Sequence, residues 1–164
     1  MFVATPLDLG DPAQAASWLE LLDHYAADPM GGGSGLSDYA RRHLVERLNG
    51  RSGFHAALVC ADDAAIGLIN CFAGFSTFAA KPLLNIHDIV VHADWRGRGI
   101  AQVLLAWAAR RAGELGCCKL TLEVLANNEK ALAAYARAGF APYVLDPAAG
   151  QALFLQKILT EETP

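Results

Sequence analysis

A predicted strand leads into a predicted long helix through the segment Arg96-Gly97-Arg98-Gly99-Ile100-Ala101. The first backbone N–H groups of a helix have no partner within the helix, and the helix dipole makes this end favourable for an anion. The two glycines allow the backbone to approach a ligand closely, and the two arginines add positive charge. The segment therefore predicts an anion site suited to a pyrophosphate. An ordinary strand-to-helix turn with solvated arginines would explain the same residues.

Apolar periodicity and turn residues predict the elements on either side of this segment. In chain order they are an extended run at 2–5, a helix capped by Asp11, a helix capped by Ser37, strands at 54–61 and 65–75 joined by a turn at Asp62-Asp63, a strand at 84–91, a helix from Ile100 to Gly116, a strand at 119–124, a helix at 128–138, and strands at 140–145 and 152–158. This order predicts an α/β fold with a mixed sheet of about seven strands and helices on both faces.

The length and composition fit one folded domain. The chain has 164 residues, of which 54% are hydrophobic and 18% are charged, and this balance excludes intrinsic disorder. A net charge of −4 disfavours a general nucleic-acid coat. No window approaches the roughly 18 apolar residues of a membrane helix. We therefore expect a single domain over residues 1–164, with a frayed tail at 160–164, that binds neither nucleic acid nor membrane.

The first basic residue is Arg41, so the N-terminal segment lacks the positive region of a secretory signal and the arginine-rich face of a mitochondrial presequence. A cytoplasmic location follows, provided that the sequence is the full native chain. The four cysteines form no C-x-x-C pair, and no His, Cys and carboxylate cluster has the spacing of a metal site. We therefore expect reduced thiols and no metal.

Two nucleotide-binding patterns are missing at the glycine turn. A Walker A loop requires a Gly-Lys-[Ser/Thr] run, which the chain does not have. A dinucleotide-binding fingerprint requires a third glycine at the position of Gln102. In that fingerprint the helix follows the first strand of the fold, whereas here it comes late in the chain. Both absences disfavour an unrelated nucleotide-binding module.

Two motifs, in order and each on its predicted element, resemble signatures of the GNAT superfamily of N-acetyltransferases. The family's [QR]-x-x-G-x-[GA] loop, which cradles the pyrophosphate of acetyl coenzyme A, is matched by Arg96-x-x-Gly99-x-Ala101. The N-x-x-A-x-x-x-Y-x-x-x-G-F block of the next helix is matched by Asn128-x-x-Ala131-x-x-x-Tyr135-x-x-x-Gly139-Phe140. The order of predicted elements also matches the family fold, so the resemblance covers nearly the whole chain.

The resemblance implies an enzyme that passes the acetyl group of acetyl coenzyme A directly to a primary amine of a small molecule or a protein. A relative that binds the coenzyme without catalysis, as a sensor or scaffold, is the alternative. The final strands of relatives often build dimers, so the resemblance also favours a homodimer. Carried over residue by residue, the coenzyme site comprises Ile89, Val90, Val91, Arg96, Gly97, Arg98, Gly99, Ile100, Ala101, Asn128 and Tyr135.

In relatives the coenzyme lies where two central parallel strands part, here the predicted strands 84–91 and 119–124. Backbone groups of residues 89–91 would pair with the pantetheine arm and aim an N–H at the thioester carbonyl, whose oxygen gains charge under attack. Asn128 either contacts the coenzyme or caps its helix. Tyr135 matches the tyrosine that protonates the departing thiolate in many relatives, and the alternative is an aromatic side chain packed on the sheet.

The attacking amine must lose its proton, so a base is expected among His87, Asp88 and Glu123. Adjacent strand residues point to opposite faces, which puts His87 and Asp88 on different faces and His87 on that of Ile89 and Val91. His87 is either the base or a hydrogen-bonded core histidine. Asp88 either faces the acceptor or meets a cation such as an arginine. Glu123 would act through water or form a surface salt bridge.

The acceptor is expected at the end of the first helix, the glycine-rich loop after it and the ends of the central strands. The candidate substrate contacts are Tyr25, Asp28, Met30 and Asp88. Asp28 and Asp88 would attract a cationic amine. The glycines after Met30 either let the loop close over a ligand or form a plain flexible linker. Some polyamine-acetylating relatives have Glu-Asp where this chain has His87-Asp88, which weakens the prediction of a polyamine substrate.

Overall fold

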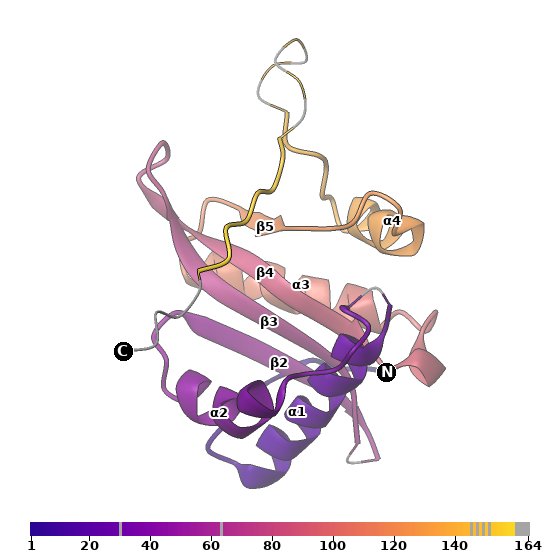
Figure 1. The fold of residues 1–164 in the computed structure, drawn as a ribbon. Helices are drawn as coiled ribbons and strands as arrows, with labels where there is room; N and C mark the ends of the chain where they lie inside the picture. The colour runs from indigo at the N-terminus through magenta and orange to yellow at the C-terminus, as the bar shows by residue number, and fades with distance from the viewer. Residues whose placement is uncertain are drawn as a thin grey trace.

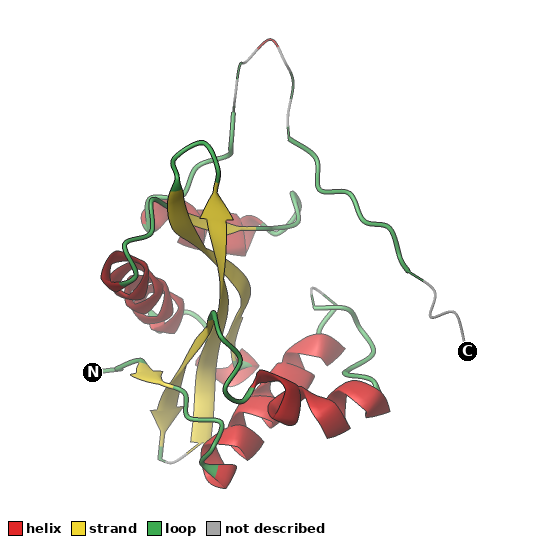
Figure 2. Ribbon diagram, turned by 90° about the vertical axis from the view of Figure 1, so that its left-hand side faces the viewer, coloured by secondary structure: helices red, strands yellow, loops and turns green. Residues whose placement is uncertain are grey.

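The computed structural model describes residues 1–29, 31–62, 64–144, 146, 148, 150 and 152–159. In these residues one mixed sheet lies between helices on both faces (Figure 1; Figure 2). The strands are β1 (Thr5–Pro6), β2 (Phe54–Ala61), β3 (Ala64–Ser76), β4 (Lys81–Val91) and β5 (Leu120–Leu122). The helices are α1 (Pro12–Ala27), α2 (Asp38–Leu48), α3 (Ile100–Glu114) and α4 (Glu129–Arg137), with a short 3-10 turn η1 (Ala93–Trp95). The strands follow the order β1-β2-β3-β4-β5, and every pair is antiparallel except β4 and β5.

Side chains cap three helices where the sequence predicts their first residues. Asp11, Ser37 and Asn128 each accept a hydrogen bond from a backbone N–H in the first turn of the helix that follows. These caps satisfy donors that the helix itself leaves unpaired. The predicted α/β class is confirmed, and β2, β3 and β4 lie close to their predicted bounds.

Two apolar layers hold the sheet between the helices. The layer under α3 includes Ile86 and Leu104, and the layer under α1 and α2 is centred on Trp18 with Leu58 and Leu68. All five side chains are at most 3% exposed. Burying a side chain of this size stabilises the fold by roughly 1.5–3 kcal/mol. The alternation of strand side chains between the two layers follows from the pleat of the sheet.

The predicted final strands are wrong. Residues 141–144 and 152–159 make no strand pairs, so the described chain has a sheet of five strands instead of about seven. An apolar run becomes a strand only where a neighbouring strand pairs with it, and neither segment has such a neighbour. Figure 2 shows the segment 152–159 apart from the sheet. Its large apolar side chains are at least 73% exposed, and they are Leu153, Phe154, Leu155, Ile158 and Leu159.

Three other expectations concern the ends of elements. β5 covers Leu120–Leu122, so it is shorter than the predicted strand at 119–124. Asp63 of the predicted turn between β2 and β3, Leu145 at the end of a predicted strand, and the predicted frayed tail 160–164 lie outside the described residues.

The start of α3 packs closely against β3 at Gly67. A Cβ added to Gly67 would lie 2.6 Å from Cγ2 of Ile100 and 3.3 Å from Cδ1 of Leu104. Ile100 is 1% exposed and Leu104 is fully buried, so neither side chain has open space to move into. The missing side chain at residue 67 therefore lets the first turn of α3, and the glycine turn before it, approach the sheet.

We predict that Gly67→Ala lowers the free energy of unfolding by about 1–3 kcal/mol, because the added methyl group overpacks the contact with Ile100. Urea denaturation of the two proteins measures this change. Gly113→Ala is the matched control, because a Cβ at this α3 position meets nothing within 4 Å. The control is expected to leave stability unchanged or to raise it by up to about 1 kcal/mol. Equal effects of the two substitutions would contradict the packing described here.

Candidate functional site

The turn between β4 and α3 forms a nest of unpaired backbone N–H groups. Gly97 and Gly99 have φ angles of 78° and 83°, in the left-handed region that glycine adopts without strain. Gly99 is the N-cap of α3 and supplies no side chain to the helix. Within the described chain, the N–H groups of residues 97–101 donate no hydrogen bond. Five consecutive free donors at the N-terminus of a 15-residue helix are suited to an anion.

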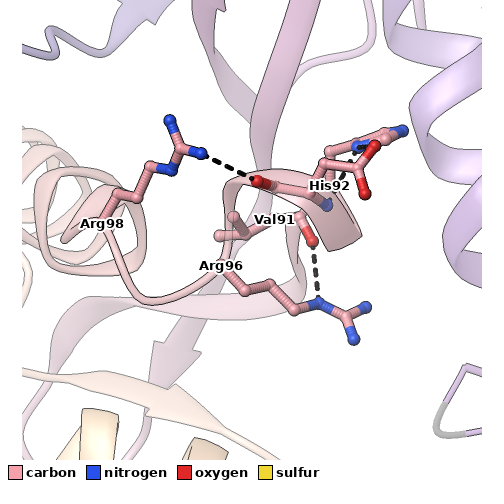
Figure 3. A network of polar contacts seen from close by, with 5 residues as sticks. Val91, His92, Arg96 and Arg98 are labelled. Carbon is pink, nitrogen blue, oxygen red and sulfur yellow. Dashed lines mark hydrogen bonds and ion pairs between the residues drawn. The ribbon is translucent and has the colours of Figure 1, made fainter.

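Two arginines leave this turn on different sides (Figure 3). The Nε of Arg96 donates to the carbonyl of Val91 at 3.2 Å, and its guanidinium pairs with Asp28 at 2.9 Å. The guanidinium of Arg98 lies 4.7 Å from the ring centroid of Trp95. Both arginines are exposed, so their charge adds to the field of the N–H nest.

β4 and β5 part beside the turn. Their parallel pairing covers only Leu84–Ile86 with Leu120–Leu122, so residues 87–91 of β4 have no partner in β5. Asn85 fixes the paired part, since its Nδ2 donates to Oγ1 of Thr121 at 3.0 Å. The predicted separation of two parallel strands is present, although β5 is the edge strand of the described sheet, and residues 89–91 lie on the part of β4 beyond their pairing.

A β-bulge interrupts β4 at His87. Asn70 of β3 is opposite Asp88, and the next residue of β3, Cys71, is opposite Ile86. His87 is therefore an extra residue on β4, which shifts the alternation of side chains along the strand.

Side-chain contacts show the consequence of the bulge. Asp88 accepts a hydrogen bond from Asn70, and the ring of His87 lies edge-on to Phe72 with centroids 5.6 Å apart. Asn70 and Phe72 are two residues apart on β3, so they point to the same face, the one covered by α1. The expectation that His87 and Asp88 lie on different faces is wrong. His87 also does not share the face of Ile89, which packs toward α3.

A buried polar chain orients Asp88. The indole N–H of Trp18 donates to Oδ1 of Asn70 at 2.9 Å, and Nδ2 of Asn70 donates to Oδ2 of Asp88 at 3.0 Å. Trp18 is fully buried and Asn70 is 2% exposed, so these groups depend on one another for partners. Asn70 is not among the site residues predicted from the sequence, although it is the polar residue inside a run of apolar residues in β3.

Two tyrosines and two carboxylates converge next to this chain. Burial raises the pKa of Tyr25, and the negative charges of Asp88 and Asp28 raise it further. Burial also raises the pKa of Tyr135, with a smaller contribution from Tyr25. Both phenols therefore stay protonated at neutral pH. Tyr25 is thus close enough to Asp28, Asp88 and Tyr135 for their electrostatic interaction, which connects the predicted substrate contacts with the predicted acid.

The segment after α1 folds back on the helix end. The backbone N–H groups of Gly31, Gly32 and Gly33 all donate to the carbonyl of Asp28, at 2.8–3.1 Å. Asp23 accepts a hydrogen bond from the backbone N–H of Leu36 at 2.8 Å. These bonds hold the loop at both ends, beside Asp28.

Other predicted residues lie outside this cluster. Glu123 is exposed and makes no hydrogen bond or ion pair with the described residues. The side chain of Asn128 caps α4 at 3.2 Å from the N–H of Ala131, so it fills the structural role that was one of its two alternatives. Met30 lies outside the described residues.

Cys71 is next to Asn70 in β3, and its thiol is buried. Burial, with a smaller effect of the Asp88 charge, raises the pKa of Cys71 to about 12, so this thiol is not a nucleophile at neutral pH. No three His, Cys, Asp or Glu side chains of the described chain come close enough together to hold a metal ion. No described helix is both long enough and apolar enough to cross a bilayer.

Residues 18–140 match the model of the acetyltransferase (GNAT) family. Streptothricin acetyltransferase of Streptomyces lavendulae is 46% identical over 77 residues, which are 47% of this chain and 41% of that protein. The N-alpha-acetyltransferase MAK3 of Arabidopsis thaliana is 46% identical over 52 residues, which are 32% of this chain and 27% of that protein. The matches therefore span less than half the length of these curated relatives.

The fold also resembles solved structures over almost its whole length. One is the aminoglycoside N-acetyltransferase AAC(6')-Iy in complex with CoA, with a TM-score of 0.73 and 18% identity over 96% of this chain and 93% of that chain. At this level of identity the similarity establishes the fold.

We predict that Asn70→Ala lowers the free energy of unfolding by about 1–3 kcal/mol, because it leaves the indole N–H of Trp18 buried without a partner. Trp18→Phe, alone and combined with Asn70→Ala, completes a double-mutant cycle followed by urea denaturation. The cost of the double substitution should be smaller than the sum of the two single costs. Additive costs would mean that this hydrogen bond does not contribute to stability.

Proposed function

Because the chain belongs to the acetyltransferase (GNAT) family, we propose that it transfers the acetyl group of acetyl coenzyme A to a primary amine. The observation that carries this proposal is the nest of free N–H groups at residues 97–101, placed directly beside the parting of β4 and β5. An anionic head and an extended arm are the two parts of acetyl coenzyme A that such a surface accommodates.

The residues around the turn fit the coenzyme. Residues 97–101 and the guanidinium groups of Arg96 and Arg98 would bind the pyrophosphate through charge-assisted hydrogen bonds. The edge of residues 89–91 that faces away from β3 has no partner in β5, and it would hold the pantetheine arm as a neighbouring strand would. When bound, acetyl coenzyme A supplies the acetyl group as an activated thioester. A backbone N–H of this part of β4 would stabilise the negative charge that develops on the carbonyl oxygen.

Tyr135 is proposed as the general acid. Its phenol is half-buried and protonated at neutral pH, because burial raises its pKa. It can therefore donate a proton to a departing thiolate. Its ring also lies edge-on to Phe140, with centroids 6.0 Å apart, so the packing role and the catalytic role are compatible.

The acceptor amine is proposed to bind on the α1 face of β4. Asp88, held by Asn70, and Asp28 would attract a cationic amine, and the charges of both act on Tyr25. His87 lies on the same face and is exposed, so it is the proposed base that removes the proton from the amine. A small-molecule amine is favoured over a protein amine, because the match to streptothricin acetyltransferase is longer than the match to the N-alpha-acetyltransferase MAK3.

A homodimer is part of the same proposal. The apolar side chains of residues 152–159 are largely exposed, and burying them against a second chain would stabilise the assembly.

Isothermal titration is the first test of this proposal. We predict that acetyl coenzyme A binds and that ATP and NAD bind much more weakly. Arg98→Glu should lower the affinity for acetyl coenzyme A by about tenfold or more through charge repulsion. Arg42→Glu makes the same charge change on the exposed face of α2 and should leave the affinity within about twofold. Absence of binding to the folded protein would remove the main support for the proposed function. Binding without release of thiol in a panel of amines would indicate a non-catalytic relative.

We predict that Tyr135→Phe lowers kcat by about 100-fold and leaves the Kd for acetyl coenzyme A within a few fold, because only the proton donor is lost. Thiol release in the presence of an accepted amine measures kcat, and titration measures Kd. Tyr143→Phe, at an exposed position outside the cluster, is the control and should leave kcat unchanged. An unchanged kcat in Tyr135→Phe would contradict the assignment of the general acid.

A further inference from the structure

A second cavity lies at the opposite end of α3 from the glycine turn. It has a volume of about 690 Å³, is open to solvent, and is lined by the last turns of α3, the start of β2, the end of α2 and the segment after β1. Arg110 in its wall is ten residues after Ile100, which is about 15 Å along a helix. The cavity is therefore separate from the site proposed for the coenzyme, although the same helix forms part of both.

The lining of this cavity has a net positive charge, because it contains three arginines and only two carboxylates. Arg51 and Arg110 both line it, and neither side chain makes a hydrogen bond or ion pair with the described residues. The two carboxylates of the lining are already engaged. Asp8 accepts the backbone N–H of Gly10 at 2.8 Å, and Glu114 pairs with Arg111 at 2.9 Å. Two exposed guanidinium groups thus remain for a ligand.

The floor of the cavity adds two more polar groups. Arg111 lies 3.4 Å from Nδ1 of His55, so a third guanidinium is held in place there. Burial lowers the pKa of His55, with a smaller effect of the Arg111 charge, so the imidazole is neutral at neutral pH. The positive charge of this pair therefore belongs to Arg111.

Trp107 supplies a further donor. Its side chain is 8% exposed and lines the cavity, and its indole N–H has no hydrogen-bond partner among the described residues. No buried side-chain nitrogen of the described chain lacks a partner, so this N–H reaches solvent. An indole nitrogen only donates, so it is suited to an acceptor on a ligand.

Apolar residues form most of the remaining wall, which also includes Asn49. Leu7, Leu48 and Phe54 line the cavity beside the charged groups. A cavity that combines apolar walls with a few convergent donors is typical of small-molecule sites.

We propose that this cavity binds a small organic anion, with its carboxylate or phosphate on Arg51 and Arg110 and its apolar body against Phe54 and Trp107. The donors of the cavity outnumber its free acceptors, which selects an anion over a cation. The apolar walls select an aromatic or aliphatic body over an inorganic ion. This site is independent of the proposed acetyl transfer.

Nuclear magnetic resonance of the full chain tests this proposal with phenyl phosphate as the probe. The chain has three tryptophans, so three indole N–H signals are expected, and Trp107→Phe identifies the one from the cavity. Phenyl phosphate should shift the Trp107 signal in a saturable manner and leave the signal of Trp18, which is bonded to Asn70, unchanged. Inorganic phosphate and phenol, each carrying half of the probe, should bind more weakly.

Arg51→Glu and Arg110→Glu should each weaken the binding of phenyl phosphate by about tenfold or more. Arg137→Glu makes the same charge change on α4, outside the lining, and should keep the affinity within about twofold. A shift confined to Trp95 beside the glycine turn, no saturable shift, or equal binding by phenol alone would each overturn the proposal. Acetyl coenzyme A added to the same samples tests the two sites separately. If acetyl coenzyme A binds but phenyl phosphate does not shift the Trp107 signal, the anion site is rejected and the proposed acetyl transfer is not.

Discussion

β4 is paired with β3 over its whole length, but with β5 only at Leu84–Ile86. The rest of its β5 side is an edge whose backbone donors and acceptors need another partner. This edge leads directly into η1 and the glycine turn, where the N–H groups of residues 97–101 are also unpaired. Two neighbouring stretches of free backbone are therefore built into the fold, one extended and one concave. An extended ligand with an anionic end can engage both of them without disturbing the core.

The bulge at His87 decides which side chains accompany this edge. Ile86 precedes the bulge and Ile89 follows it, and both contribute to the apolar layer under α3. A regular strand cannot place both of these residues on one face, because they are three positions apart. The extra residue allows it and turns both His87 and Asp88 toward α1. Without the bulge one of these polar side chains would enter the α3 layer, where a polar group without a partner costs about 1–3 kcal/mol.

The sequence predicts those parts of the molecule that depend on local chemistry. The caps at Asp11 and Ser37 and a turn into a helix at Gly97 and Gly99 follow from individual residues and their neighbours, and the structure confirms them. The bulge could not be predicted, because it depends on the pairing of β4 with β3. The role of Asn70 depends in the same way on Trp18, which lies 52 residues away in the chain.

The final strands show the opposite failure. Residues 152–158 have the apolar composition of a strand, and this composition alone predicts one. Strand formation also requires an edge that reaches the segment, and β5 ends after three residues. The described chain therefore keeps this segment extended and exposed, which composition could not indicate.

Arg96 connects the two halves of the proposed site. Its guanidinium pairs with Asp28 on the acceptor side, while its backbone belongs to the turn proposed for the pyrophosphate. The side chain of Arg96 is 52% exposed and that of Asp28 is 21% exposed, and ion pairs with this exposure contribute about 0–1 kcal/mol. A pyrophosphate beside a helix N-terminus offers Arg96 a stronger, charge-assisted partner. Under the proposed function, an anion in the turn therefore weakens the hold of Arg96 on Asp28 and increases the negative charge that Asp28 presents next to Asp88, where a cationic amine is proposed to bind.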